Sequence, residues 1–406
     1  MYPLETDTLT SIVSRVLRIE DITPGNPKLG YISRYRGRLY SEDSVAAYDQ
    51  LAAALHPLEI TPLFRKDRDR HVVLLIQGIR RASPSKVWVN LLMFALTVIS
   101  VFIAGTSYAL AGNYNGPANP DFRSLLPALL QSAGGGAAFT ISLLAILLAH
   151  EFGHYFAGRY HNTHVTLPYF IPFPFSAIGT MGAFIQLKEP PKNRRILLDI
   201  GIAGPIAGLV VAIPMLLLGL SLSEIRPIPA QLPQGQFLQI EGNSILYLLS
   251  KLVVFGKLLP EPGTYGDMAP WLYWLRYFFT GQPLPLGGMD VYLHPVAWAG
   301  WIGLLVTALN LIPAGQLDGG HLLYVLLGQR TNSLLPIILG ALLVLGFVSP
   351  TWWIWAFLIL ILGRLHAEPL DQITPLDPQR RALAVLGLVI FLLVFTPVPL
   401  LTAGLS

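Results

Sequence analysis

Residues 142–160 are SLLAILLAHEFGHYFAGRY, and this stretch decides how the rest of the chain is interpreted. It begins with an uncharged apolar run and then carries His150, Glu151 and His154. On a helix, residues four apart lie about 40° apart around the axis, so both imidazoles can reach one metal ion while Glu151 lies beside it. Ionisable side chains are costly inside a membrane-spanning helix unless they bind something. The stretch therefore predicts a buried metal site, with Glu151 placed to act as a general base.

The composition of the chain indicates a membrane protein. Of its 406 residues, 53% are hydrophobic and 12% are charged, whereas soluble domains have about 25% charged residues. Long apolar blocks separated by short polar loops predict a polytopic α-helical membrane protein with about seven crossings. We expect these crossings at residues 87–110, 137–160, 197–220, 295–327 (broken), 334–348, 352–365 and 382–400. The expected surroundings are a lipid bilayer, and the net charge of +4 implies no nucleic acid partner.

The chain divides into four predicted regions. Residues 1–86 have mixed helical and strand patterns, which predict a small soluble α+β domain without a cleavable secretory signal. Residues 87–136 form the first crossing and an outer loop, residues 137–328 form the core that carries the site, and residues 329–406 form the C-terminal crossings.

Basic residues give the expected orientation in the membrane. They collect in loops 65–86, 188–195 and 364–381 and at Arg330, all on one side of the proposed crossings. The positive-inside rule makes this side the cytoplasm, so we expect a cytoplasmic N-terminus and a site toward the cytoplasmic side. Segment 246–259, which carries Lys251 and Lys257, predicts an interfacial amphipathic helix. Tryptophans near the ends of the spans predict an interfacial belt: Trp88, Trp298, Trp301, Trp352, Trp353 and Trp355.

A catalytic metal site usually has a third protein ligand. The chain has no cysteine, so this ligand must be His, Asp or Glu, and the best candidate is Asp318 in the segment NLIPAGQLDGGH, residues 310–321. Pro313 and the glycines of this segment are expected to break the helix, which is tolerated at membrane depth where the chain lines a wet cavity. Asp290 is a weaker candidate, and Asp318 could alternatively pair with His321 at a helix end.

The two motifs resemble those of the site-2 proteases, a family of intramembrane zinc metalloproteases with HExxH on one core helix and N-x-x-P-x-x-x-x-D-G on a later one. The resemblance implies one Zn²⁺ per chain, held by His150, His154 and Asp318. It also implies that Glu151 is the general base and that Asn310 holds the substrate backbone. The implied substrate is a transmembrane segment of another, membrane-anchored protein.

The resemblance covers roughly residues 137–328. Residues 161–170, 178–184 and 203–208 are also similar to the ethylene-dependent gravitropism-deficient yellow-green-like branch of the family.

Small residues mark two further segments. Gly179 and Thr180 begin a short segment, 179–186, which we expect to be extended and whose edge could bind an unwound substrate by main-chain pairing. A plain buried hairpin is the alternative. Gly201, Gly204 and Gly208 are spaced to allow close helix approach.

The same residues are compatible with three other functions. A metal-ion transporter could use the same ligands for a passing ion, but the sequence has no internal repeat. A non-catalytic membrane scaffold would not need an intact general base. A histidine-box desaturase could add His161 and His164, but the remaining histidines are scattered, so these two are expected to be solvated or to line the mouth at the cytoplasmic helix end.

Overall fold

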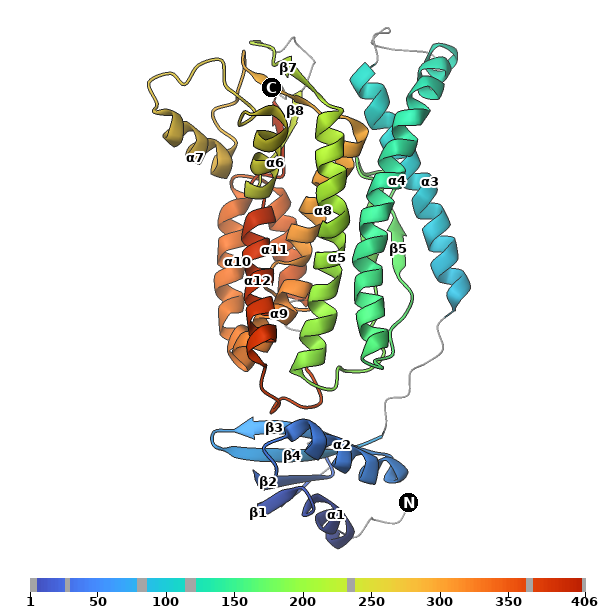
Figure 1. Cartoon of the computed structure of the whole chain (residues 1–406), viewed down its shortest axis with the longest axis vertical. Coiled ribbons are helices and arrows are strands. Elements are labelled where there is room, and N and C mark those ends of the chain that lie inside the picture. Colours follow the sequence, from blue (N-terminus) through green and yellow to red (C-terminus); the bar gives the residue numbers. More distant parts are fainter. Residues whose placement is uncertain are drawn as a thin grey trace.

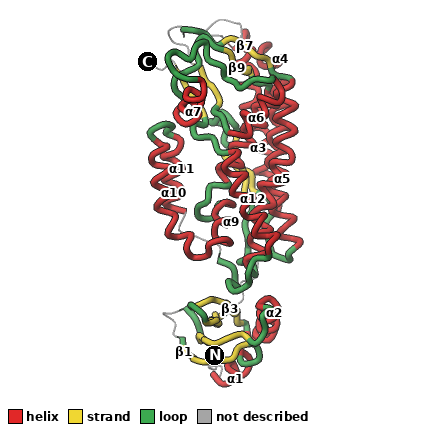
Figure 2. The backbone as a smooth tube through the Cα atoms, turned by 60° about the vertical axis from the view of Figure 1, so that its left-hand side comes forward, coloured by secondary structure: helices red, strands yellow, loops and turns green. Residues whose placement is uncertain are grey.

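The computed structural model describes residues 6–25, 30–78, 86–113, 122–231, 238–362 and 368–403. It shows a long bundle of helices with a small α+β unit, formed by the N-terminal residues, at one end (Figure 1). We call the end of the bundle next to this unit the near end and the opposite end the far end. A second view shows the same separation between the bundle and the N-terminal unit (Figure 2).

The N-terminal unit is a four-stranded antiparallel sheet packed against two helices. The sheet order is β1-β2-β4-β3, and the elements are α1 (Thr6–Val13), β1 (Leu17–Pro24), β2 (Ser33–Leu39), α2 (Ser44–Leu55), β3 (Ile60–Asp67) and β4 (Arg70–Gln77). Leu51, Phe64 and Val73 are almost fully buried between helices and sheet. The mixed helical and strand patterns of residues 1–86 thus correspond to an α+β unit, and in β1 a bulge between Ile19 and Asp21 breaks the alternation of buried and exposed residues.

A C-terminal segment hydrogen-bonds to the free edge of this sheet. The Phe64 amide donates to the Leu370 carbonyl at 2.9 Å, and the Gln372 amide donates to the Phe64 carbonyl at 3.0 Å. On its other side the same segment bonds to the loop that precedes α5, because the Leu370 amide donates to the Pro191 carbonyl at 3.0 Å. The N-terminal unit is thereby joined by backbone pairing to the near end of the bundle.

The bundle confirms the membrane-protein class, but not the number of crossings. Its helices are α3 (Val87–Asn113), α4 (Phe122–Tyr160), α5 (Arg194–Ser221), α8 (Pro295–Asn310), α9 (Asp318–Leu327), α10 (Thr331–Gly346), α11 (Thr351–Leu362) and α12 (Pro378–Val394). Within the described ranges, four stretches are long and apolar enough to cross a membrane: Val87–Gly112, Leu125–Tyr160, Arg194–Ser221 and Asp318–Gly346. Counting described residues, helices α8, α11 and α12 have 16, 12 and 17 residues, fewer than the roughly 20 that a full crossing needs.

Helix α8 is the centre of the bundle and packs against α4 and α5. Ala297, Ile302 and Leu304 on this helix are at most 1% exposed. Because protein rather than lipid surrounds α8, its length of about 24 Å need not match the bilayer. The outer helices instead expose large apolar side chains, as expected for lipid contact: Leu91, Ile99, Ile103, Ile337, Val344, Ile354 and Phe357.

The far end carries shorter elements: β7 (Glu224–Pro227), β8 (Leu238–Glu241), α6 (Ile245–Phe255), α7 (Pro270–Thr280), β9 (Met289–Tyr292) and β10 (Leu400–Ala403). Here the prediction of an interfacial amphipathic helix was wrong for Lys251, which is 0% exposed. Its Nζ donates to the Leu259 carbonyl at 3.0 Å and lies 3.5 Å from Glu241 Oε1 and 3.9 Å from Asp290 Oδ1. Lys251 can be buried here because acidic side chains from β8 and β9 compensate its charge.

The predicted tryptophan belt holds only in part. Trp88 and Trp353 are exposed, as an interfacial position requires, but Trp298, Trp301 and Trp352 are buried. The rings of Trp298 and Trp301 stack at 4.8 Å. Both tryptophans belong to the buried helix α8, so they fill the protein core instead of contacting the membrane interface.

Candidate metal centre

Helix α4 brings His150, Glu151 and His154 to its inner face, where all three are at most 6% exposed. Glycines allow α5 to pack closely against this face. A Cβ atom on Gly153 would lie 2.6 Å from the Ala203 carbonyl oxygen, and one on Gly204 would overlap the imidazole of His154. The predicted close helix approach is therefore observed, since Gly204 meets His154 and a Cβ atom on Gly208 would lie 3.2 Å from Cβ and Nδ1 of His150.

A break between α8 and α9 brings in the carboxylate. Helix α8 ends at Asn310 and α9 begins at Asp318, as the proline and glycines of this segment predicted. A Cβ atom on Gly319 would overlap the Leu311 carbonyl, so the turn needs glycine there. Asp318 lies in the first turn of α9, where the helix dipole favours a negative charge.

His150, His154 and Asp318 form a nearly equilateral triangle. The two Nε2 atoms are 3.2 Å apart, and each lies 3.4 Å from Asp318 Oδ2. Ligand atoms bound tetrahedrally to zinc at about 2.0–2.1 Å are about 3.3–3.4 Å apart. The three side chains therefore fit three corners of a zinc tetrahedron, which leaves the fourth corner for a water molecule or substrate.

The hydrogen bond of His154 favours metal binding over a network of hydrogen bonds. His154 Nδ1 lies 2.7 Å from the Ile200 carbonyl oxygen, which can only accept, so Nδ1 is the protonated nitrogen. In the neutral imidazole, Nε2 then carries the lone pair that faces His150 and Asp318. Metal-bound histidines usually hold their tautomer through a bond of this kind.

Glu151 and Asn310 lie next to the triangle. Glu151 Oε2 is fully buried and has no hydrogen-bond partner among the described residues. Buried carboxylate oxygens normally have a partner, and a water molecule at the open corner of the triangle would provide one. Asn310 Nδ2 lies 3.2 Å from His150 Nε2, so the end of α8 contacts the same site.

The other two predicted site residues belong to a hairpin formed by β5 (Tyr169–Pro172) and β6 (Thr180–Phe184). The Gly179 carbonyl accepts from Ser100 Oγ at 2.6 Å, and Thr180 Oγ1 donates to the Ile171 carbonyl at 2.7 Å. Both residues thus fix the hairpin to itself and to α3. Strand β6 contacts α4, and within the described chain its two-stranded sheet leaves it one unpaired edge.

The remaining ionisable candidates lie elsewhere. Asp290 is in the far-end cluster with Lys251 and is not part of the triangle. His161 Nε2 lies 2.9 Å from Asp199 Oδ2, and His164 Nδ1 lies 2.9 Å from Glu189 Oε1. These two histidines pair with separate carboxylates at the near end, which does not favour a second metal site.

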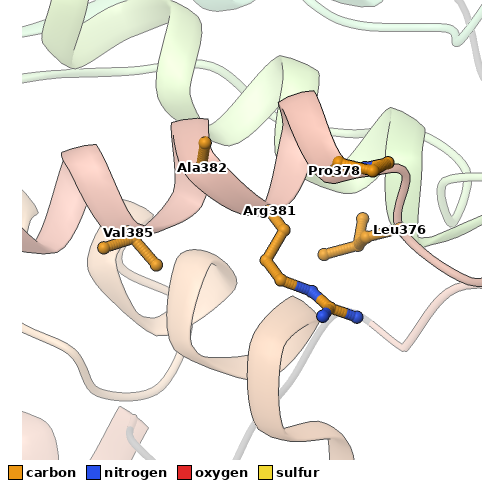
Figure 3. Close-up of a pocket in the computed structure, with 5 residues that line it drawn as sticks. All are labelled: Leu376, Pro378, Arg381, Ala382 and Val385. Atoms are coloured by element: carbon orange, nitrogen blue, oxygen red, sulfur yellow. The ribbon is translucent and has the colours of Figure 1, made fainter.

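A surface pocket of about 500 Å³ lies at the start of α12 (Figure 3). Its lining residues are Leu376, Pro378, Arg381, Ala382 and Val385. It shares no residue with the triangle, and among its lining residues only Arg381 is ionisable, so the pocket adds nothing to the chemistry of the site.

We predict that Gly204→Ala weakens zinc binding by about 10- to 100-fold, because the new methyl group displaces the His154 imidazole from the Ile200 carbonyl. Competition with a zinc chelator measures the affinity. Gly201→Ala, one turn earlier on α5, is the control, since its methyl group would meet His321 Cβ at 3.3 Å and no ligand side chain. Equal affinities of the two variants would contradict the geometry described above.

Comparison with known proteins agrees with this geometry. The sequence of residues 138–348 matches the protein family described as "Peptidase family M50". The "Probable zinc metalloprotease EGY1, chloroplastic" of Oryza sativa subsp. japonica is 29% identical over 344 residues, which cover 80% of this chain and 53% of that protein. The "Probable zinc metalloprotease EGY2, chloroplastic" of Arabidopsis thaliana is 30% identical over 279 residues, which cover 68% of this chain and 44% of that protein.

The chain thus spans about half the length of these curated relatives. No solved structure matches it. The family model covers more than half of the chain and includes both halves of the metal centre. The predicted resemblance is therefore confirmed: this chain belongs to peptidase family M50, the family of the site-2 proteases.

Proposed function

We propose that the chain is an intramembrane zinc metalloprotease that hydrolyses peptide bonds within or next to transmembrane segments of membrane-anchored proteins. The observation that carries this proposal is the buried triangle of His150, His154 and Asp318, with the Glu151 carboxylate beside it. The relatives named above are described as probable zinc metalloproteases, which supports it.

Each residue of the site has a proposed role. His150, His154 and Asp318 would hold zinc, which when bound polarises the scissile carbonyl and acidifies water. Glu151 accepts a proton from the attacking water and passes it to the leaving amine. Asn310, at the end of α8, hydrogen-bonds the substrate backbone near the scissile bond.

The unpaired edge of β6 is the proposed substrate-binding strand. A helical substrate must unwind before its peptide bond can be attacked, and strand pairing supplies main-chain hydrogen bonds to the unwound segment. Gly179 and Thr180 would act by fixing the start of this strand, since their own polar groups are bonded within the hairpin and to α3. The exposed Met181 would contact the substrate directly.

We also propose a membrane arrangement with seven crossings and a cytoplasmic near end. The basic residues Lys192, Arg195, Arg330 and Arg381 lie in near-end turns and helix starts, which supports this orientation. Under this proposal residues 1–86 form a cytoplasmic domain, residues 87–136 the first crossing, the outer loop and the start of α4, residues 137–328 the protease core, and residues 329–406 the C-terminal crossings.

The proposed ligands predict the metal content of two variants. Asp318→Asn should lose most of its zinc, because an amide is a poor replacement for a charged ligand, whereas Asp290→Asn should keep roughly one zinc per chain. Elemental analysis of the purified proteins measures both. Full zinc content in Asp318→Asn would show that the third ligand is a different residue.

Glu151→Gln should abolish cleavage of a model transmembrane substrate, with at least about a 10²-fold loss in rate, while zinc content stays unchanged. The measurement is cleavage in proteoliposomes, with zinc flux followed in parallel. A wild-type chain that moves zinc, does not cleave, and keeps its flux in Glu151→Gln would identify a transporter and contradict the proposal.

The edge of β6 can be tested by crosslinking because the chain contains no cysteine. In a Glu151→Gln background, Met181→Cys should form disulfides with single cysteines placed near the scissile bond of the substrate. Val210→Cys on α5 is the control, since Val210 is 66% exposed and Met181 is 68% exposed. Equal crosslinking of the two cysteines would argue against substrate pairing at β6.

A further inference from the structure

The Asp199 carboxylate makes several short polar contacts at the near end of the bundle. Asp199 lies on α5, and Arg380 on α12 donates to its carboxylate from two nitrogens, from Nε at 2.9 Å to Oδ1 and 3.2 Å to Oδ2, and from Nη2 at 2.6 Å to Oδ2. Two-point contacts between guanidinium and carboxylate are strong and fix the relative orientation of the two groups. His161, directly after α4, adds a third contact at 2.9 Å. One carboxylate therefore connects three helices.

Asp199 is adjacent in sequence to Ile200, whose carbonyl oxygen binds Nδ1 of His154. The Ile200 side chain is 4% exposed and packs in the core, so its carbonyl has little freedom to move alone. A shift of α5 relative to α4 would change the bond to His154 directly. The two helices approach each other closely at Gly153 and Gly204, so a shift of α5 would act directly on the groups that touch there.

Arg380 is itself held in place. Its Nη1 lies 2.8 Å from Asp377 Oδ2, and the Asp377 side chain also caps the start of α12 by accepting from the Arg380 amide at 2.8 Å. The chain just before this cap is the segment that pairs with the N-terminal sheet, and its Thr374 hydroxyl hydrogen-bonds to the hydroxyl of Ser44 at the start of α2. The position of Arg380 therefore depends on how this segment docks on the N-terminal unit.

We infer that Asp199 is a positioning residue of the metal centre: by binding Arg380 and His161 it fixes α5 so that the Ile200 carbonyl holds His154 in the metal-binding tautomer. This inference rests on the proposed role of His154 as a metal ligand. Asp199 acts through α5 and does not itself contact the substrate. It also gives a physical route by which docking of the N-terminal unit affects the metal centre.

The test uses the full-length chain with Co²⁺ in place of Zn²⁺, because the visible spectrum of cobalt reports on the ligand geometry. Asp199→Asn should change this spectrum and speed the release of zinc to a chelator by about 10- to 100-fold, the usual effect of losing a residue that orients a ligand. Arg380→Gln removes the same contact from the other side and should change both measurements in the same direction.

Two matched controls separate positioning from a general loss of charge or stability. Glu189→Gln removes the other near-end carboxylate that pairs with a histidine. Arg381→Gln removes the neighbouring positive charge of α12, whose side chain lines the surface pocket (Figure 3). Both should keep the wild-type spectrum and release rate. If only one of Asp199→Asn and Arg380→Gln folds, that variant alone decides the test.

Wild-type spectra and release rates in Asp199→Asn and Arg380→Gln would overturn the inference, as would equal effects in the two controls. Neither measurement depends on peptide cleavage. Failure of the proposed protease function, seen as a wild-type chain that binds zinc without cleaving, is therefore distinguishable from failure of this inference.

Discussion

Two imidazoles and a carboxylate lie together in the apolar centre of the bundle, and the arrangement of the surrounding helices follows from bringing them within 3.4 Å of one another. Burying such groups costs several kcal/mol each unless a partner compensates them. The two histidines come from one continuous helix, but Asp318 reaches them only because α8 stops at Asn310 and the chain turns before α9. The break in the helix and the metal site are therefore one structural feature.

The helices around the site are also arranged so that the three side chains can lie together. Helix α5 approaches α4 through glycine, so that a backbone carbonyl can reach His154. Helix α8 is enclosed by protein, which keeps lipid away from the site and allows a helix too short to cross the bilayer. At the near end, backbone pairing between Phe64 and Leu370 connects the N-terminal unit to the helices that carry Asp199 and Arg380.

The sequence predicted the parts of this arrangement that depend on local patterns. The spacing of His150 and His154 and the helix break before Asp318 follow from helix geometry and from the conformations of proline and glycine. Asp318 could be assigned to the two histidines because a catalytic metal usually needs a third protein ligand, but other contacts between distant segments could not be predicted. The burial of Lys251 depends on Glu241 and Asp290, and the role of Ile200 is that of a backbone carbonyl, which any residue type provides. The spacing of Gly201, Gly204 and Gly208 did indicate close contact of α5 with a neighbouring helix, and Gly204 is the position that packs against His154.

X-ray absorption at the zinc edge of the purified wild-type chain tests the central claim most directly. The account predicts one zinc per chain in a four-coordinate shell of nitrogen and oxygen at about 2.0–2.1 Å, with scattering from two imidazoles. That result would match the triangle formed by His150, His154 and Asp318. A shell with one imidazole or none, or a six-coordinate shell of oxygen atoms, would contradict the assignment of the metal centre to these residues.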